Sequence, residues 1–250
     1  MKRMALLVMV GACFGDNGSP AVDARPTADA KADASEDLPD ALPGAVSLRI
    51  TEINPAGTTD LIELVAVTGG ALDGIKLEEL TNSDFDYTFP AGYTVATNDV
   101  ILLHLAGTCT DQVGDAASCG TAAPFTAAWD FSMPGNLSYS GKVFELTSTG
   151  GARMDAVAFV ESGGLAPAGY VAAVQLIQSR SAWDPTPCIH DPATGMAKDR
   201  YCRNISVIWD ALEDDNSNSV TRIVGAEPLT VPGSRAQWTA ALPASFGTYD

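Results

Sequence analysis

Histidine, the side chain best suited to acid–base catalysis near neutral pH, occurs only twice in this chain of 250 residues, at His104 and His190. Because His104 lies within an apolar run, we expect it on a strand face or in the core rather than acting as a general base. Two histidines leave few geometries for a Ser-His-Asp or Cys-His hydrolase. The motifs GxSxG, HExxH, GxGxxG and the P-loop are absent. We therefore expect neither catalysis nor a cofactor.

Paired carboxylates are the other candidate catalytic groups. Glu78 with Glu79, or Asp84 with Asp86, would suit glycoside hydrolysis if both acids lay on one face roughly 5 to 9 Å apart. Neighbouring acids in strands and turns are usually solvated, so a secreted carboxylate-dependent hydrolase is the alternative to a non-catalytic module. Glu63 lies inside an apolar strand pattern, and alternation favours a solvated position for it over one held by a buried donor.

The N-terminus has the layout of an export signal. Lys2 and Arg3 precede the apolar residues 4–10, and small residues follow before Cys13. Residues 10–13 resemble a bacterial lipobox, which implies removal of a signal peptide, residues 1–12, and lipidation of Cys13. An ordinary cleaved signal with a free cysteine is the alternative. Because several acyl chains hold a protein firmly to a bilayer, we expect a membrane partner through Cys13 in the bacterial cell envelope, at the outer membrane or cell surface.

Four further cysteines favour disulfides, since their number is even in a chain expected to be exported. Four cysteines allow three connectivities. We expect two short-range bonds, each within one apparent insertion at about 106–132 or 179–204: Cys109–Cys119 and Cys188–Cys202. Zinc bound by Cys188, His190 and Cys202 is a weaker alternative, because Cys-x-His followed by one distant Cys is a poor match to zinc-site spacing.

An acidic cluster near residues 210–218 offers oxygen ligands for calcium. The spacing of Asp214, Asn216 and Asn218 copies the start of a calcium-binding loop. The pattern then departs, because Ser219 replaces the required glycine and Gly225 occupies the position of the bidentate glutamate. We therefore expect a solvated acidic loop, and a calcium-dependent adhesive module is a further alternative function.

The charge balance restricts the partners. Acidic residues number 31 against 14 Lys and Arg, giving a net charge of −17, which argues against a nucleic-acid partner. Residues 13–44, rich in Ala, Asp and Pro, bury too little apolar surface to order themselves, so we expect a disordered linker behind the lipidated cysteine. No later apolar run approaches the roughly 18 residues of a membrane-spanning helix.

Residues 45–250 consist of short apolar or alternating runs broken by turn residues, which predicts an all-β sandwich or barrel. The connections are too short for crossover helices, and no long helix is expected. The predicted strands lie near residues 46–50, 62–66, 85–89, 100–105, 143–147, 154–160, 171–178, 204–209 and 219–224.

Several short motifs follow one another in a characteristic order: Ile50–Gly57, Asp60–Leu64, Asp73–Leu77, Phe89–Gly92, Gly141–Leu146, Asp155–Phe159, Ser219–Ile223 and Gln237–Trp238. Together they resemble a lamin-tail domain, which is an immunoglobulin-like β-sandwich. Leu61 and Ile75 depart from the pattern, since that family often carries tryptophan there. The two apparent insertions are a further departure.

The resemblance implies a binding or structural module without catalytic residues. We expect an envelope protein or polysaccharide as its partner, bound through loops or an exposed strand edge. Trp129, Trp183 and Trp209 lie in or beside the insertions and are candidate contacts, although core packing is their more expected role.

Overall fold

The computed structural model describes residues 45–54, 60–82, 86–105, 112–113, 128–135, 137, 140–193, 200–209, 218–223, 225 and 232–249. The predictions for residues 1–44, including Cys13, and those for Cys109, Cys119, Asp214 and Asn216 lie outside these ranges. The elements are β1 (Ser47–Asn54), β2 (Leu61–Thr68), β3 (Gly70–Ala71), β4 (Lys76–Glu79), β5 (Asp86–Thr88), β6 (Thr94–Val95), β7 (Val100–Leu105), β8 (Gln112–Val113), β9 (Trp129–Met133), β10 (Gly141–Thr147), β11 (Arg153–Glu161), α1 (Tyr170–Ser179), β12 (Val207–Trp209), β13 (Asn218–Arg222), the 3-10 turn η3 (Arg235–Gln237) and β14 (Trp238–Pro243).

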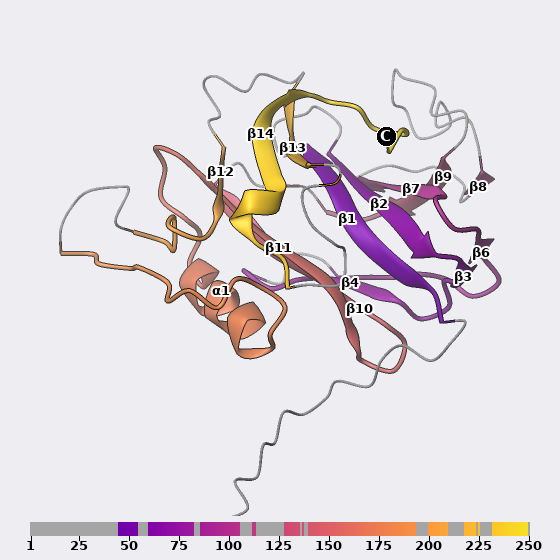
Figure 1. Cartoon of the computed structure of the whole chain (residues 1–250), viewed down its shortest axis with the longest axis horizontal. Helices are drawn as coiled ribbons and strands as arrows, with labels where there is room; N and C mark the ends of the chain where they lie inside the picture. Colours follow the sequence, from indigo (N-terminus) through magenta and orange to yellow (C-terminus); the bar gives the residue numbers. More distant parts are fainter. Residues whose placement is uncertain are drawn as a thin grey trace, which may run out of the picture. The chain divides into compact units, whose positions relative to one another are not determined.

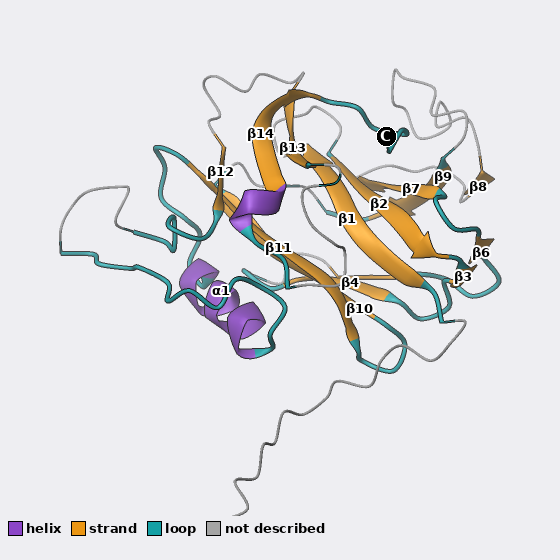
Figure 2. Ribbon diagram, viewed as in Figure 1, coloured by secondary structure: helices purple, strands orange, loops and turns teal. Residues whose placement is uncertain are grey.

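The described strands form two main sheets, which confirms the predicted all-β sandwich (Figures 1 and 2). The larger sheet has seven strands in the order β14-β13-β1-β2-β7-β9-β8, and the smaller has five in the order β12-β11-β10-β4-β5. Most neighbours are antiparallel, but β7 pairs with β9 and β11 with β12 in parallel. A small β3–β6 ladder lies outside both sheets.

The core lies between the sheets and follows from strand alternation. In β2, Ile62 and Leu64 are fully buried on the inner face, and in β11 Val157 and Phe159 belong to the same apolar cluster. Each such side chain contributes about 1.5–3 kcal/mol by leaving water. This one continuous cluster holds the two sheets together.

A charged link also joins the sheets. Asp155 in β11 accepts hydrogen bonds at one carboxylate oxygen from the Ile50 backbone N–H in β1, at 2.8 Å, and from Arg222 Nη2 in β13, at 2.6 Å. The Arg222 guanidinium lies 4.7 Å from the ring centroid of Trp238. The Asp155, Ser219–Ile223 and Gln237–Trp238 motifs therefore meet in space at a buried ion pair that fixes the sheets relative to each other.

The predicted strand at 171–178 is wrong, because residues 170–179 form α1. Tyr170, Ala173, Val174 and Ile177 are buried at the i, i+3, i+4, i+7 spacing of one helix face. Gly169 precedes them with φ of 91°, a conformation that suits glycine. The helix packs against β10. No described helix has the length and apolar character needed to cross a bilayer.

Candidate functional site: a disulfide-closed loop

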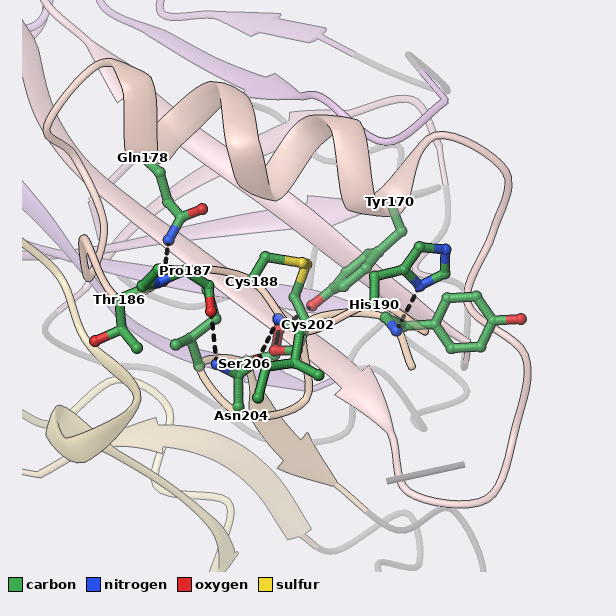
Figure 3. Close-up of a disulfide and its surroundings, with 12 residues drawn as sticks. Tyr170, Gln178, Thr186, Pro187, Cys188, His190, Cys202, Asn204 and Ser206 are labelled. Carbon is green, nitrogen blue, oxygen red and sulfur yellow. Dashed lines mark hydrogen bonds between the residues drawn. A yellow bond between two sulfur atoms is a disulfide. The ribbon is translucent and has the colours of Figure 1, made fainter. Parts of the chain in front are cut away.

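Cys188 and Cys202 form a disulfide, as predicted, across a separation of 14 residues (Figure 3). Their Cα atoms lie 4.6 Å apart, which is within the range for a disulfide. Because both sulfurs are used in this bond, neither is a thiolate ligand, and the zinc alternative at Cys188, His190 and Cys202 is not supported. The bond closes the loop between Cys188 and Cys202, which follows α1 in the chain.

Hydrogen bonds inside the loop hold its two arms together. The Asn204 side chain bridges them, since its amide nitrogen donates to the Pro187 carbonyl at 2.9 Å and its oxygen accepts from the Ile189 N–H at 3.0 Å. The Cys202 N–H donates to the Ile189 carbonyl at 3.0 Å. Figure 3 shows these contacts beneath the helix. The loop therefore presents Ile189 on a fixed backbone.

Two consecutive residues of the loop have left-handed backbones. Tyr201 has φ of 57° and Cys202 has φ of 54°. Side chains other than glycine rarely adopt this conformation, and each instance costs on the order of 1–3 kcal/mol. The turn brings the Tyr201 ring to 5.5 Å from the His190 ring, and the Tyr201 N–H donates to His190 Nδ1 at 3.1 Å. The strained backbone therefore positions two ring side chains beside each other.

The base of the loop is buried and hydrogen-bonded. The Tyr170 hydroxyl, at the start of α1, donates to Ser206 Oγ at 2.9 Å, which in turn donates to the Cys202 carbonyl at 2.9 Å. Burial raises the pKa of the Tyr170 phenol, so the group stays neutral. Trp183 Nε1 donates to the Ile205 carbonyl at 3.1 Å. These contacts anchor the loop to the helix and core.

Arg203 connects this loop to the loop that follows β11. Its guanidinium donates to the carbonyls of Ser162 and Gly164, and it lies 6.0 Å from the centroid of the Tyr201 ring. Burial lowers the pKa of Arg203, an effect that nearby tyrosines and Glu161 oppose. Beside these groups, Leu165 is 69% exposed and Ile189 is 52% exposed. We call Leu165, Ile189, His190 and Tyr201 the loop surface.

The three candidate tryptophans pack against the core, two of them buried and one half-buried. Trp183 and Trp209 are buried, at 0% and 2% exposure. Trp129 is half-buried, stacks on Phe131, and donates from its indole to Asp99 Oδ2 at 3.0 Å. Core packing, the more expected role, is the role that the structure gives them.

A second polar region lies on the outer face of the seven-stranded sheet, the face turned away from the core. Glu63 is there, but its predicted solvation is wrong, since the residue is 1% exposed. It is held by donors, Thr51 Oγ1 and the Gly247 N–H, each at 2.7 Å. The pKa of Glu63 is raised to about 8, chiefly because burial removes water, with the charge of Glu52 adding to the rise and the two hydrogen bonds opposing it.

His104 lies on the same outer face, as the strand-face prediction required. Its Nε2 lies 2.8 Å from Asp130 Oδ1, and both residues are buried. Asp130 and Glu52 are polar residues of this face that the sequence reasoning did not single out. Their signal was present, since each is a carboxylate within an otherwise apolar strand pattern.

Of the two predicted carboxylate pairs, Glu78 and Glu79 do not converge on one face, and the pair of Asp84 and Asp86 lies partly outside the described residues. Glu78 and Glu79 are consecutive in β4 and point to opposite sides of the sheet. Glu79 is buried, with its Oε2 at 3.4 Å from Lys142 Nζ, whereas Glu78 is half-buried. Asp86 is exposed in β5, and Asp84 is not among the described residues.

Metal ligation was also predicted as an alternative. Asn218, the last of the calcium candidates, begins β13, and the other two candidates lie outside the described ranges. Within the described residues, no three His, Cys, Asp or Glu side chains gather in a way that could hold a metal ion.

Comparison with known proteins places the sandwich in a family. No curated protein matches the chain. A family model described as "protein second domain" matches residues 46–221, which is more than half of the chain and spans β1 to β13. Nothing in this match connects the chain to the lamin-tail domains that its motifs resemble. On the extent of the match, the chain belongs to the family described as "protein second domain".

Proposed function

We propose that this chain is an exported, lipid-anchored envelope protein whose β-sandwich binds a partner protein through the loop surface. The observation that carries the proposal is the exposure of Leu165 and Ile189 on loops fixed by a disulfide and by Arg203. Apolar side chains held on a rigid scaffold lose little conformational entropy when they are buried in a complex. The lipobox-like residues 10–13 and the lamin-tail-like strand motifs support display at the envelope.

A protein partner fits this surface better than a polysaccharide. The two most exposed large hydrophobic side chains of the described residues are aliphatic, and such side chains serve as anchors in the apolar centre of a protein interface. Glycan recognition depends on open aromatic faces, but the Tyr201 ring is already flanked by His190 and Arg203. The proposal assigns no catalytic step, because Glu78 and Glu79 point to opposite sides of the sheet.

The test is a capture of envelope components by the immobilised, oxidised full chain, followed by mass spectrometry. Ile189→Ser is compared with Ile223→Ser, a matched control that removes an isoleucine of similar exposure, 42% against 52%, at the end of β13 rather than in the loop. We expect a stoichiometric protein that is retained by wild type and by Ile223→Ser and lost with Ile189→Ser. Equal retention by both variants, a retained polysaccharide, or no retained component would each overturn the assignment.

A further inference from the structure

The C-terminal residues 244–249 cross the outer face of the seven-stranded sheet and cover two buried acids. Ser245 donates twice to Glu52, from its N–H to Oε1 and from its hydroxyl to Oε2, each at 2.9 Å. Gly247 donates its N–H to Glu63. Phe246 and Tyr249 pack on a small apolar cluster that is separate from the main core. We call residues 244–249 the strap.

The two acids under the strap face each other directly. Glu52 in β1 is the cross-strand partner of Glu63 in β2, and both are 1% exposed. Like charges at directly opposed positions repel, and the repulsion is stronger away from water. Among the described residues, neither carboxyl forms an ion pair with a cation. The arrangement is therefore more stable when the pair carries fewer than two negative charges.

We propose that the strap is a releasable cover whose closed position requires a proton on the Glu52–Glu63 pair. Loss of this proton places two negative charges in a site that excludes water. Admitting water to the two carboxylates is the smallest structural change that reduces their repulsion. The strands themselves cannot separate easily, because β1 and β2 are paired along their length in the centre of the sheet. The strap lies at the surface, with each of its residues half-buried or exposed, so we expect the strap to detach while the strands stay paired.

The charge state of Glu63 supports this assignment, because its raised pKa places the ionisation just above neutral pH. Among the described residues, the other titratable groups on the elements packed around it are Arg49 and Glu52 in β1, His104 in β7, Asp130 in β9 and Tyr249 in the strap. The Arg49 guanidinium donates to Ser47 Oγ and the Leu48 carbonyl, and the charges that act on it are those of Asp155 and Arg222. His104 is already hydrogen-bonded to Asp130, and the two form a separate pair along the sheet. Glu52 is therefore the charge that acts on Glu63.

Release of the strap would change the surface of the molecule. The cluster beneath Phe246 and Tyr249 consists of Val100, Leu102 and Ala128, and the strap covers it together with the two acids. Opening uncovers an apolar and acidic face on the seven-stranded sheet. This second face is independent of the loop surface, so the strap proposal does not depend on the proposed function.

The test follows Gly247 by NMR in the full chain labelled with ¹³C at the glycine α carbons, since these signals, unlike amide protons, survive alkaline pH. Gly247 has φ of 87°, and release would move its signal to the random-coil position. From about pH 6 to about pH 9.5, we expect this move in wild type and in the control Glu78→Gln, but not in Glu63→Gln, which cannot ionise. The Gly74 and Gly92 signals, from turns elsewhere in the fold, should stay in place.

Two results would overturn the proposal. One is a Gly247 signal that stays native at alkaline pH in wild type, and the other is release at the same pH in wild type and Glu63→Gln. If Glu63→Gln does not fold, Ser245→Ala provides the comparison. It removes one hydrogen bond between the strap and Glu52, so it should open at a lower pH than wild type, and an unchanged opening pH would contradict the strap mechanism.

Discussion

Replacing Glu63 by Gln should change how the stability of the fold depends on pH. The Glu63 carboxyl has an ordinary pKa of 4.5 when solvated and a raised pKa of about 8 in the folded chain. Between these values the folded state holds a proton that the unfolded state has lost, so stability falls as pH rises. The span from 4.5 to about 8, at about 1.4 kcal/mol per pH unit, corresponds to a loss of about 5 kcal/mol.

Urea unfolding of wild type and Glu63→Gln across this pH range measures the effect. Glutamine mimics the protonated acid, can hydrogen-bond with Thr51 and Gly247, and does not titrate. The free energy of unfolding of wild type relative to the variant should be greatest below pH 4.5, decline through the window, and level off above about pH 8. Parallel pH profiles for the two proteins would refute the reasoning, because they would show that Glu63 does not retain its proton on folding. Glu78→Gln should track wild type.

Three further predictions concern other parts of the chain. Replacing Cys188 and Cys202 by Ala should lower the free energy of unfolding by about 3 kcal/mol, because the ring is short, and urea denaturation showing no loss would contradict a structural disulfide. Asp155→Ala should cost about 3–5 kcal/mol in the same assay, since it leaves the Arg222 guanidinium buried and unpaired; a cost below about 1 kcal/mol would mean that the pair is solvated. Cys13→Ala should move the protein from the membrane fraction to the soluble fraction in immunoblots, and unchanged membrane retention would refute the lipid anchor.

The strands were predictable where alternation or apolar runs were uninterrupted. The run predicted at 100–105 matches β7 residue for residue. Prediction failed at 170–179, where alternating and helical spacing coexist in one short segment. The helical spacing prevails because it buries Tyr170, Val174 and Ile177 together beside β10. A tertiary contact of this kind is not visible in a local pattern.

The environment of Glu63 illustrates a different limit. Alternation correctly places this side chain on the face opposite Ile62 and Leu64, and for an outer face the ordinary inference is contact with water. Burial comes instead from Gly247, 184 residues further along the chain. The Cys188–Cys202 bond, in contrast, joins residues close in sequence, and their shared position in one apparent insertion was the basis for predicting it. The prediction therefore succeeded for the disulfide, whose partners are close along the chain, and failed for Glu63, whose partner is distant.

The loop surface and the strap differ in how their positions are fixed, and this difference bears on their roles. A covalent bond, backbone hydrogen bonds and Arg203 hold Ile189 and Tyr201, and none of these contacts depends on the proton of a carboxyl group. The strap is held by donors to Glu52 and Glu63, and burial raises the pKa of Glu63. A surface that must bind with little entropic cost benefits from the first kind of restraint. A cover that must open requires the second, in which a single proton shifts the balance between two states.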